Sequence, residues 1–288
     1  MTDASASTPK KDANAQEFTN RAAGMSSHGV LRDEFRTRIE EHGACGSALA
    51  MPTVSVVIPT LNEARNLPLV IARLPSWVHE IVIVDGRSTD NTPAIALASS
   101  PKVRIVLETK PGKGAALRAG FRAAGGDIIA MLDADGSMNP RELILFVGAL
   151  ISGVDFAKGS RFVQGGGTTD MSFYRMMGNW CLTHITRVLY GSAFSDLCYG
   201  YNAFWAHNLW ALDVDQDGFE IETAMNISAI RSGLKVAEVP SFEARRVHGV
   251  SHLRPISDGF RVLSTILSEW TRPKRSTRWA GAPSDAWL

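Results

Sequence analysis

The chain has 288 residues, 45% of them hydrophobic and 20% charged, and its formal net charge at pH 7 is +1. This balance is typical of a folded globular enzyme, and so small a net charge does not favour a nucleic-acid-binding protein. The three cysteines lack a CxxC spacing, which argues against a disulfide framework or a zinc site and is typical of a reducing cytoplasm.

Composition divides the chain into three parts. Residues 1–51 are polar and rich in small residues, and we expect a disordered or partly helical N-terminal arm. Residues 52–270 carry regular apolar patterns and form a single predicted domain. Residues 271–288 form a basic C-terminal tail, a candidate for peripheral contact with an anionic membrane surface. Without a signal-peptide core or a run of about 18 apolar residues, we expect a cytoplasmic protein, peripheral at the inner face of the membrane if that contact forms.

Within the domain, β-branched runs alternate with helical apolar patterns. The runs that predict strands are 53–59, 80–85, 103–107, 128–132, 155–158 and 235–240. The patterns that predict helices are 62–74, with Asn62 as N-cap, then 88–100, 115–124, 140–151, 172–191, 218–233 and 256–270. Such alternation is typical of an α/β fold with a mostly parallel sheet covered by helices on both faces.

Acidic residues end two of these strands. Asp85 closes one strand, and Asp133-Ala134-Asp135 follows another. Residues i and i+2 of a strand share a face, and parallel strands place their carboxyl ends at the edge where ligands bind. The Asp133/Asp135 spacing alone is compatible with a polar turn or with a Mg²⁺ or Mn²⁺ site. Three acids at one edge repel one another unless a cation lies among them, which favours a metal–diphosphate site.

The second half of the domain is less regular. Residues 162–170 contain three consecutive glycines and predict a mobile loop beside the site. Asp196 is a lone acid before a Tyr/Gly-rich turn. Glu220 and Glu222 fall in the first turn of a helix, where either the helix dipole or catalysis would explain them.

The predicted helix 172–191 is rich in large apolar residues. We expect most of them to pack in the core, and the alternative is a wall for a hydrophobic acceptor. They are Phe173, Met176, Met177, Trp180, Ile185, Val188 and Leu189.

Five motifs follow one another in a fixed order. They are Val56–Glu63, Val84–Thr92, Gly112-Lys113-Gly114, Asp133-Ala134-Asp135 and Gly159-Ser160-Arg161. Together they resemble the family 2 glycosyltransferases, over roughly residues 53 to 255. The segments Gly159–Gly167 and Arg246-x-x-Gly249-x-Ser251 resemble the polyprenyl- or dolichyl-phosphate mannosyl- and glucosyltransferase branch in particular.

The resemblance implies a GT-A fold, which is Rossmann-like, a GDP- or UDP-sugar donor, a Mg²⁺ or Mn²⁺ ion and inversion at the anomeric carbon. Residues carried over to the base and ribose pocket are Pro59, Thr60, Asn62, Glu63 and Asp85, with Lys113 near the nucleotide. The Asp133-Ala134-Asp135 turn would meet the ribose and the metal, with both aspartates as metal ligands. Arg161 and Arg246 would neutralise phosphate on the donor or the acceptor.

Two positions depart from the family pattern. Ser137 stands where the branch often carries a side-chain amide, so it is not among the expected metal ligands. Asp85-Gly86-Arg87-Ser88 replaces the usual Asp-Asp-Gly-Ser, which leaves the recognised base open.

The acceptor has two candidate classes. A polyprenyl phosphate is already an anionic nucleophile and needs no strong base, and the glycine loop and Arg246 motif favour it. A soluble acceptor, such as a secondary-metabolite sugar or an aglycone, is favoured by the absence of an expected membrane span. If it attacks through a hydroxyl, it needs a carboxylate base, for which Asp196, Glu220 and Glu222 are the candidates.

Two other functions are disfavoured. A sugar nucleotidyltransferase needs a Gly- and Arg-rich loop after the first strand, which Pro59–Glu63 is not. A non-catalytic scaffold would not need the retained Asp133, Asp135, Lys113 and Arg161.

Overall fold

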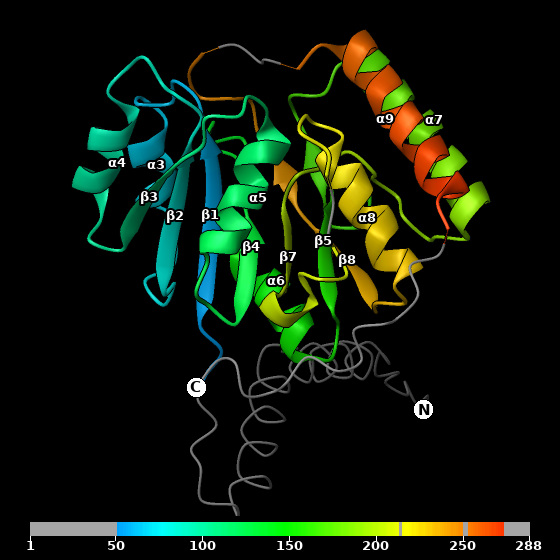
Figure 1. The fold of residues 1–288 in the computed structure, drawn as a ribbon, viewed down its shortest axis with the longest axis horizontal. Helices are drawn as coiled ribbons and strands as arrows, with labels where there is room; N and C mark the ends of the chain where they lie inside the picture. Colours follow the sequence, from blue (N-terminus) through cyan, green and yellow to red (C-terminus); the bar gives the residue numbers. More distant parts are fainter. Residues whose placement is uncertain (1–50, 213–214, 250–252, 274–288) are drawn as a thin grey trace, which may run out of the picture. The chain divides into compact units, whose positions relative to one another are not determined.

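The computed structural model describes residues 51–212, 215–249 and 253–273. The expectations for the N-terminal arm and for the tail beyond residue 273 lie outside these residues. In the described part, seven strands form one sheet in the order β3-β2-β1-β4-β7-β5-β8 (Figure 1). Their bounds are Val54–Thr60 (β1), Glu80–Asp85 (β2), Val103–Leu107 (β3), Ile128–Met131 (β4), Phe156–Ser160 (β5), Asn202–Trp205 (β7) and Val236–Pro240 (β8).

The predicted mostly parallel sheet is confirmed. The strand β7 is the antiparallel member, paired with β4 and with β5. The sequence did not predict this strand, because its four residues follow a Tyr/Gly-rich turn and are too few to show a period. β7 brings β5 and β8 into the same sheet as the acidic strand ends of β2 and β4.

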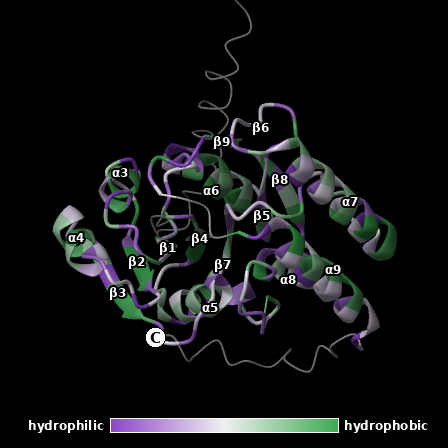
Figure 2. Cartoon of the chain, turned by 90° about the horizontal axis from the view of Figure 1, so that it is seen from above, coloured by the Kyte–Doolittle hydropathy of each residue, from purple (hydrophilic) through white to green (hydrophobic). Residues whose placement is uncertain are grey.

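Helices cover both faces of the sheet. The helices α3, α4 and α6 lie on one face of the sheet and share one apolar cluster with it. The helices α5 and α8 lie on the other face and share a second cluster. A third cluster joins α7, α8 and α9 (Figure 2). The bounds are Leu67–Ile71 (α3), Thr92–Ser99 (α4), Lys113–Ala123 (α5), Leu143–Ile151 (α6), Phe173–Tyr190 (α7), Ile221–Arg231 (α8) and Pro255–Thr271 (α9), with short 3₁₀ turns at Pro140–Glu142 and Ala206–Asn208.

The β1 sequence shows why the sheet is two-sided. Val56 and Ile58 pack into one cluster and Val57 into the other, because successive side chains of a strand point to opposite faces. All three side chains are buried. A strand covered on both faces reads as a continuous apolar run, as β1 does.

Two local predictions are wrong. Asn62 does not cap a helix, since α3 begins at Leu67 and Asn62 has a left-handed φ of 58°. Its side chain instead accepts hydrogen bonds from the loop after β2. The segment 162–170 is not an unpacked loop, because Gly167–Thr168 forms β6, which pairs in parallel with β9, Phe242–Glu243.

The expectation of core packing for the predicted helix 172–191 is wrong for most of its large residues. Ile185 and Leu189 of α7 do pack in the third cluster. The others are exposed on the outer face of the helix, namely Phe173, Met176, Met177, Trp180 and Val188. Among the described residues, no helix is both long and apolar enough to cross a bilayer.

Candidate active site

The carboxyl ends of β1, β2 and β4 meet at one edge of the sheet. Thr60, the last residue of β1, lies beside Asp85, the last residue of β2. On the other side of β1, the Leu132 amide donates to the Val57 carbonyl at 3.1 Å, so the chain leaves β4 directly into Asp133. The structure thus brings together the strand-end acids that the sequence predicted to converge.

Asp135 lies in a tight turn that contacts the segment after β9. Its Oδ1 accepts a hydrogen bond from the Ser137 amide at 2.9 Å, and its carbonyl accepts one from the Val247 amide at 3.2 Å. Gly136 has φ +77°, and a Cβ there would press on Val247. Glycine is therefore required both by the backbone conformation and by the close approach of the two segments.

Arg246 forms ion pairs with two carboxylates from different strand ends. Its Nη2 lies 3.0 Å from Asp135 Oδ2, and its Nη1 lies 2.9 Å from Glu63 Oε1. The planar guanidinium suits this fork, since its parallel N–H groups can bind two acceptors at once. Arg246, some 180 residues from Glu63 in the chain, thus ties the loop after β9 to the loop after β1.

Lys113 forms the matching contact on the other aspartate. Its ammonium lies 2.6 Å from Asp133 Oδ1 and 2.7 Å from Glu222 Oε1. Burial alone would lower the pKa of Lys113, but the two carboxylates raise it above its ordinary value. Lys113 is therefore a permanent cation.

These contacts define what we call the acidic edge: Glu63, Lys113, Asp133, Asp135, Glu222 and Arg246. Its four carboxylates share two cations. The side chains of Asp133 and Asp135 keep 28% and 14% of their surface exposed, so a ligand can reach them. Hard carboxylate oxygens beside an excess of negative charge fit Mg²⁺ or Mn²⁺. The described residues contain no group of three or more His, Cys, Asp or Glu side chains that could hold a metal ion.

The loops after β1 and β2 are locked together. Asn62 Oδ1 accepts from the Thr89 amide at 2.7 Å, and the Asn62 amide donates to Ser88 Oγ at 2.9 Å. Asp85 Oδ2 accepts from the Ser88 amide at 3.0 Å. The other oxygen of Asp85 is buried without a hydrogen-bond partner in the described structure. A buried carboxylate oxygen left free in this way is suited to accept a hydrogen bond from a ligand.

The glycines beside Lys113 have a structural explanation. A Cβ at Gly112 or Gly114 would collide with the backbone of Gln216 and Asp217. The Asp217 carbonyl accepts from the Gly114 amide at 2.7 Å, and its side chain is paired with Lys110 at 2.7 Å. The motif therefore allows the segment before α8 to lie against the start of α5, and this places Glu222 beside Lys113.

Arg161 does not lie on the acidic edge. Its side chain is 3% exposed, and it donates to Asp196 Oδ2 through Nε at 2.7 Å and to Glu243 Oε2 through Nη1 at 3.0 Å. Nη2 donates to Asp196 Oδ1 at 2.9 Å, and the guanidinium lies 4.7 Å from the centre of the Tyr199 ring. With each nitrogen bonded to a carboxylate, Arg161 joins the end of β5 to the loop that carries Asp196 and to Glu243 of β9.

Asp196 is committed to the same buried group. Burial would raise the pKa of its carboxyl, but Arg161 lowers it, and Asn179 donates a further hydrogen bond at 3.1 Å. Glu238 accepts from the Asp196 amide at 3.2 Å. We call these residues, Arg161, Asn179, Asp196, Glu238 and Glu243, the Arg161 cluster. Sequence reasoning missed Glu238 and Glu243, because an acid within or beside a predicted strand has no spacing that identifies its partner.

The remaining candidate bases differ in their surroundings. Burial raises the pKa of Glu222, while its ion pair with Lys113 opposes that change. Glu220 accepts from the Gly218 amide at 3.1 Å, and its second oxygen has no partner among the described residues. Of the three candidates, Glu220 alone is without an ion pair in the described part of the chain.

Comparison with known families and proteins gives a consistent set of similarities. The family model described as "Glycosyl transferase family 2" matches residues 55–208. The polyprenol monophosphomannose synthase of Mycolicibacterium smegmatis is 36% identical over 75% of this chain and 85% of that protein. The undecaprenyl-phosphate mannosyltransferase of Micrococcus luteus is 33% identical over 79% of this chain and 96% of that protein.

Solved structures give the same architecture. The glucosyl-3-phosphoglycerate synthase of Mycobacterium tuberculosis, in complex with Mn²⁺, UDP-glucose and phosphoglyceric acid, superposes with a TM-score of 0.63. It is 26% identical to this chain, over 78% of this chain and 82% of that one.

Proposed function

Because this chain belongs to glycosyl transferase family 2, we propose that it moves a hexose from a GDP- or UDP-sugar to a polyprenyl phosphate, with inversion at the anomeric carbon. The observation that carries the proposal is the acidic edge, where Asp133 and Asp135 each face a cation at the ligand-binding side of the sheet. The 36% identity to a polyprenol monophosphomannose synthase supports the choice of acceptor.

The nucleotide of the donor is proposed to lie over the ends of β1 and β2. Pro59 and Thr60 end β1, and Asn62 and Glu63 belong to the loop that the Asn62–Thr89 contact fixes in place. The free buried oxygen of Asp85 would accept a hydrogen bond from the base or the ribose. Because the two loops are already bonded to each other, little conformational entropy would be lost on binding.

The diphosphate is proposed to lie over Asp133, Ala134 and Asp135. The two aspartates would hold Mg²⁺ or Mn²⁺, as their oxygen donors and net negative surroundings suit such an ion, and the ion would neutralise the leaving nucleoside diphosphate. Lys113 and Arg246 are fixed cations beside the same aspartates. They would stabilise the negative charge that develops as the glycosidic oxygen leaves.

The attacking group is proposed to be the phosphate oxygen of the acceptor. It approaches the anomeric carbon from the side opposite the leaving diphosphate, and the new bond forms as the old one breaks. An ionised phosphate carries no proton that must be removed, so no general base is required. This agrees with the ion pairs that occupy Asp196 and Glu222.

A second candidate acceptor is a soluble phosphorylated acid. It is supported by the 26% identical glucosyl-3-phosphoglycerate synthase, which was solved with phosphoglyceric acid. Both acceptor classes carry phosphate, and the donor half of the proposal is the same for both.

The test is a transfer assay with the purified full chain. Radiolabelled GDP-mannose, GDP-glucose, UDP-glucose and UDP-galactose are each incubated with Mn²⁺ or Mg²⁺ and either undecaprenyl phosphate or 3-phosphoglycerate. We expect label in the organic phase with undecaprenyl phosphate and one preferred donor. Label found only in a water-soluble product would reject the lipid acceptor and favour the second candidate.

A further inference from the structure

The helix α7 exposes large apolar side chains although part of its inner side is polar. Its fully buried residues are Asn179, Thr183 and Thr186, and Ile185 and Leu189 are half-buried beside them in the third cluster. Its outer face carries large apolar residues with high exposure: Phe173 65%, Tyr174 80%, Trp180 65% and Val188 69%. A helix in water normally places such residues inside, so this outer face is built to be covered by something apolar.

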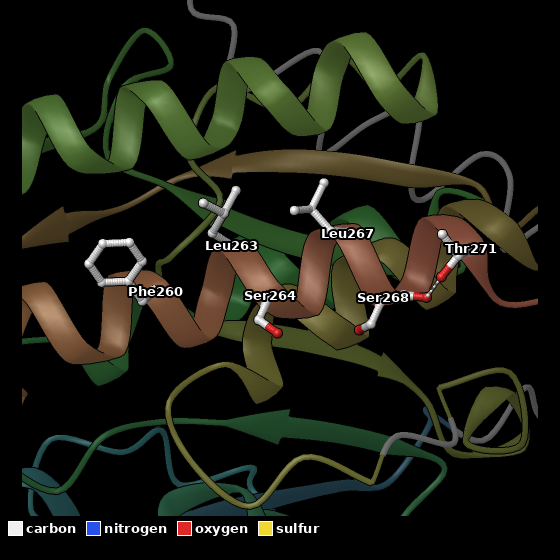
Figure 3. A pocket seen from close by; sticks show the side chains of 6 residues that line it. All are labelled: Phe260, Leu263, Ser264, Leu267, Ser268 and Thr271. Atoms are coloured by element: carbon white, nitrogen blue, oxygen red, sulfur yellow. Dashed lines mark hydrogen bonds between the residues drawn. The ribbon is translucent and has the colours of Figure 1, made fainter.

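The helix α9 adds a second apolar stripe. Ile256, Phe260, Leu267 and Trp270 lie on one side of it and are 77%, 69%, 50% and 51% exposed. Leu263 continues the stripe, and Figure 3 shows Phe260, Leu263 and Leu267 projecting from one side while Ser264 and Ser268 project from the other. The buried side of the helix includes Val262 and Ile266.

The two helices lie side by side at the end of the sheet opposite β3 (Figure 2). Tyr190, at the end of α7, donates to the Ile266 carbonyl at 2.7 Å, and its ring lies 5.5 Å from that of Trp270. Since the C-terminal ends meet, the helices run in the same direction. We call their outward-facing apolar residues the α7–α9 face. All are exposed except the half-buried Leu263, and they are Phe173, Tyr174, Met177, Trp180, Val188, Ile256, Phe260, Leu263, Leu267 and Trp270.

The charges around this face are unequal. Arg187 of α7 is exposed, and the side chain of Arg261 of α9 is 64% exposed. The acids of α9, Asp258 and Glu269, keep only 8% and 12% of their side-chain surface exposed. Aromatic residues beside exposed arginines are the composition that binds at the boundary between acyl chains and anionic head groups.

We propose that the α7–α9 face docks on an anionic lipid bilayer. A second copy of the chain is a poorer occupant, because a twofold contact would cover Arg187 and Arg261 with a face that offers them no exposed acid: α7 carries none, and those of α9 are nearly buried. Lipid phosphates would pair with those arginines while the acyl region covers the aromatic residues. The inference rests on the proposed function for its purpose, since a polyprenyl phosphate acceptor would lie in the bilayer that this face binds. In the chain, α7 follows β6 and α9 follows the segment that carries Arg246.

The test is flotation of the full chain with vesicles of phosphatidylcholine containing about 30 mol % phosphatidylglycerol, an anionic surface. The variant is Trp180→Ser with Phe260→Ser. Removing two aromatic residues from an apolar contact is expected to weaken vesicle binding by ~10-fold or more. The matched control is Leu97→Ser with Ile144→Ser, which changes two helix residues of 56% and 55% exposure outside this face and is expected to float like the wild type.

A charge variant tests the choice of lipid. Arg187→Glu with Arg261→Glu is expected to lose the preference for anionic over pure phosphatidylcholine vesicles. Flotation of both variants like the wild type would overturn the proposal. So would a wild-type dimer in sedimentation that does not bind vesicles and that the aromatic variant dissociates, since the face would then join two copies.

An assay without vesicles separates this inference from the proposed function. With a short-chain isoprenyl phosphate in free solution, the aromatic variant is expected to keep wild-type turnover, because no residue of the acidic edge is changed. Loss of turnover in this assay would contradict a docking role. A wild-type protein that binds vesicles but transfers sugar to no isoprenyl phosphate would reject the proposed acceptor and leave the docking surface standing.

Discussion

Arg246 and Arg161 both bind two carboxylates, yet their surroundings give them opposite properties. On the acidic edge, Arg246 is 20% exposed and its partners Asp135 and Glu63 come from loops. In the Arg161 cluster, the arginine is 3% exposed and Asp196 is fully buried. A partly hydrated ion pair can exchange a carboxylate for a phosphate at little cost, whereas a buried pair cannot lose a partner without leaving an uncompensated charge. The comparison predicts a ligand-binding role for Arg246 and a structural role for Arg161.

The largest effect is expected at the buried cluster. Arg161→Met should lower the free energy of unfolding by about 3–5 kcal/mol, because Asp196 and Glu243 remain buried without their cation. The change in the free energy of unfolding is measured by urea denaturation. Arg161→Met with Asp196→Leu should recover part of the loss, since Asp196 then no longer leaves a buried charge, while Glu243 still does. Arg104→Met, at a pair that is 49% and 17% exposed, is the control and should change stability by less than about 1 kcal/mol.

The next largest effect is expected at the acidic edge, on turnover rather than on stability. Asp135→Asn should lower turnover by ~10²–10³-fold, because it removes negative charge from the proposed metal site, and leave the melting temperature almost unchanged. The control is Asp215→Asn, at an exposed pair with Arg272. If Asp135→Asn instead lowered the melting temperature and left the turnover of the folded protein unchanged, the two clusters would have the same structural role and the comparison would fail.

A smaller loss of turnover is expected when the guanidinium of Arg246, which binds two carboxylates at once, is replaced. Arg246→Lys keeps the charge but cannot bind Asp135 and Glu63 with two fixed N–H groups. Turnover should fall by ~10-fold or more, with a smaller change in stability than at Arg161. The neighbouring Arg245→Lys is a close control, since Arg245 is exposed and, within the described part of the chain, its side chain donates to the Thr169 carbonyl alone, at 3.4 Å. Equal activity of the two variants would show that charge alone matters at position 246.

The sequence predicted that Asp85, Asp133 and Asp135 would lie at one edge of the sheet, but it did not predict the Arg161 cluster, and the reason is physical. Asp85, Asp133 and Asp135 end predicted parallel strands, and topology alone brings such ends together. Arg161 also follows a strand, so it was expected to face phosphate. Its true partners, Asp196 and Glu243, reach it only because β7 enters antiparallel between β4 and β5 and because β6 pairs with β9. Pairings over so few residues leave no periodic signal.

The same limit applies to α7. Its composition favoured burial, because large apolar residues are usually inside. Which face of a helix meets the core depends on its neighbours, and the polar side of α7 is turned inward by the contact of Asn179 with Asp196 and of Thr183 with the Leu197 amide. A hydrogen-bonded buried side of this kind cannot be read from hydropathy.

The smallest predicted effect bears on the acceptor. Glu220→Gln should change turnover by less than ~3-fold, because an anionic phosphate nucleophile gives up no proton, whereas loss of a general base costs about 10²–10⁴-fold. Glu220 is the informative position, since Asp196 and Glu222 are each bound to a cation and their removal would disturb Arg161 or Lys113 as well. Turnover of Glu220→Gln is measured with undecaprenyl phosphate across a range of pH. A loss of a hundredfold at neutral pH that recovers as pH rises would identify Glu220 as a base that removes a proton from the acceptor phosphate, and would contradict attack by a phosphate that is already ionised.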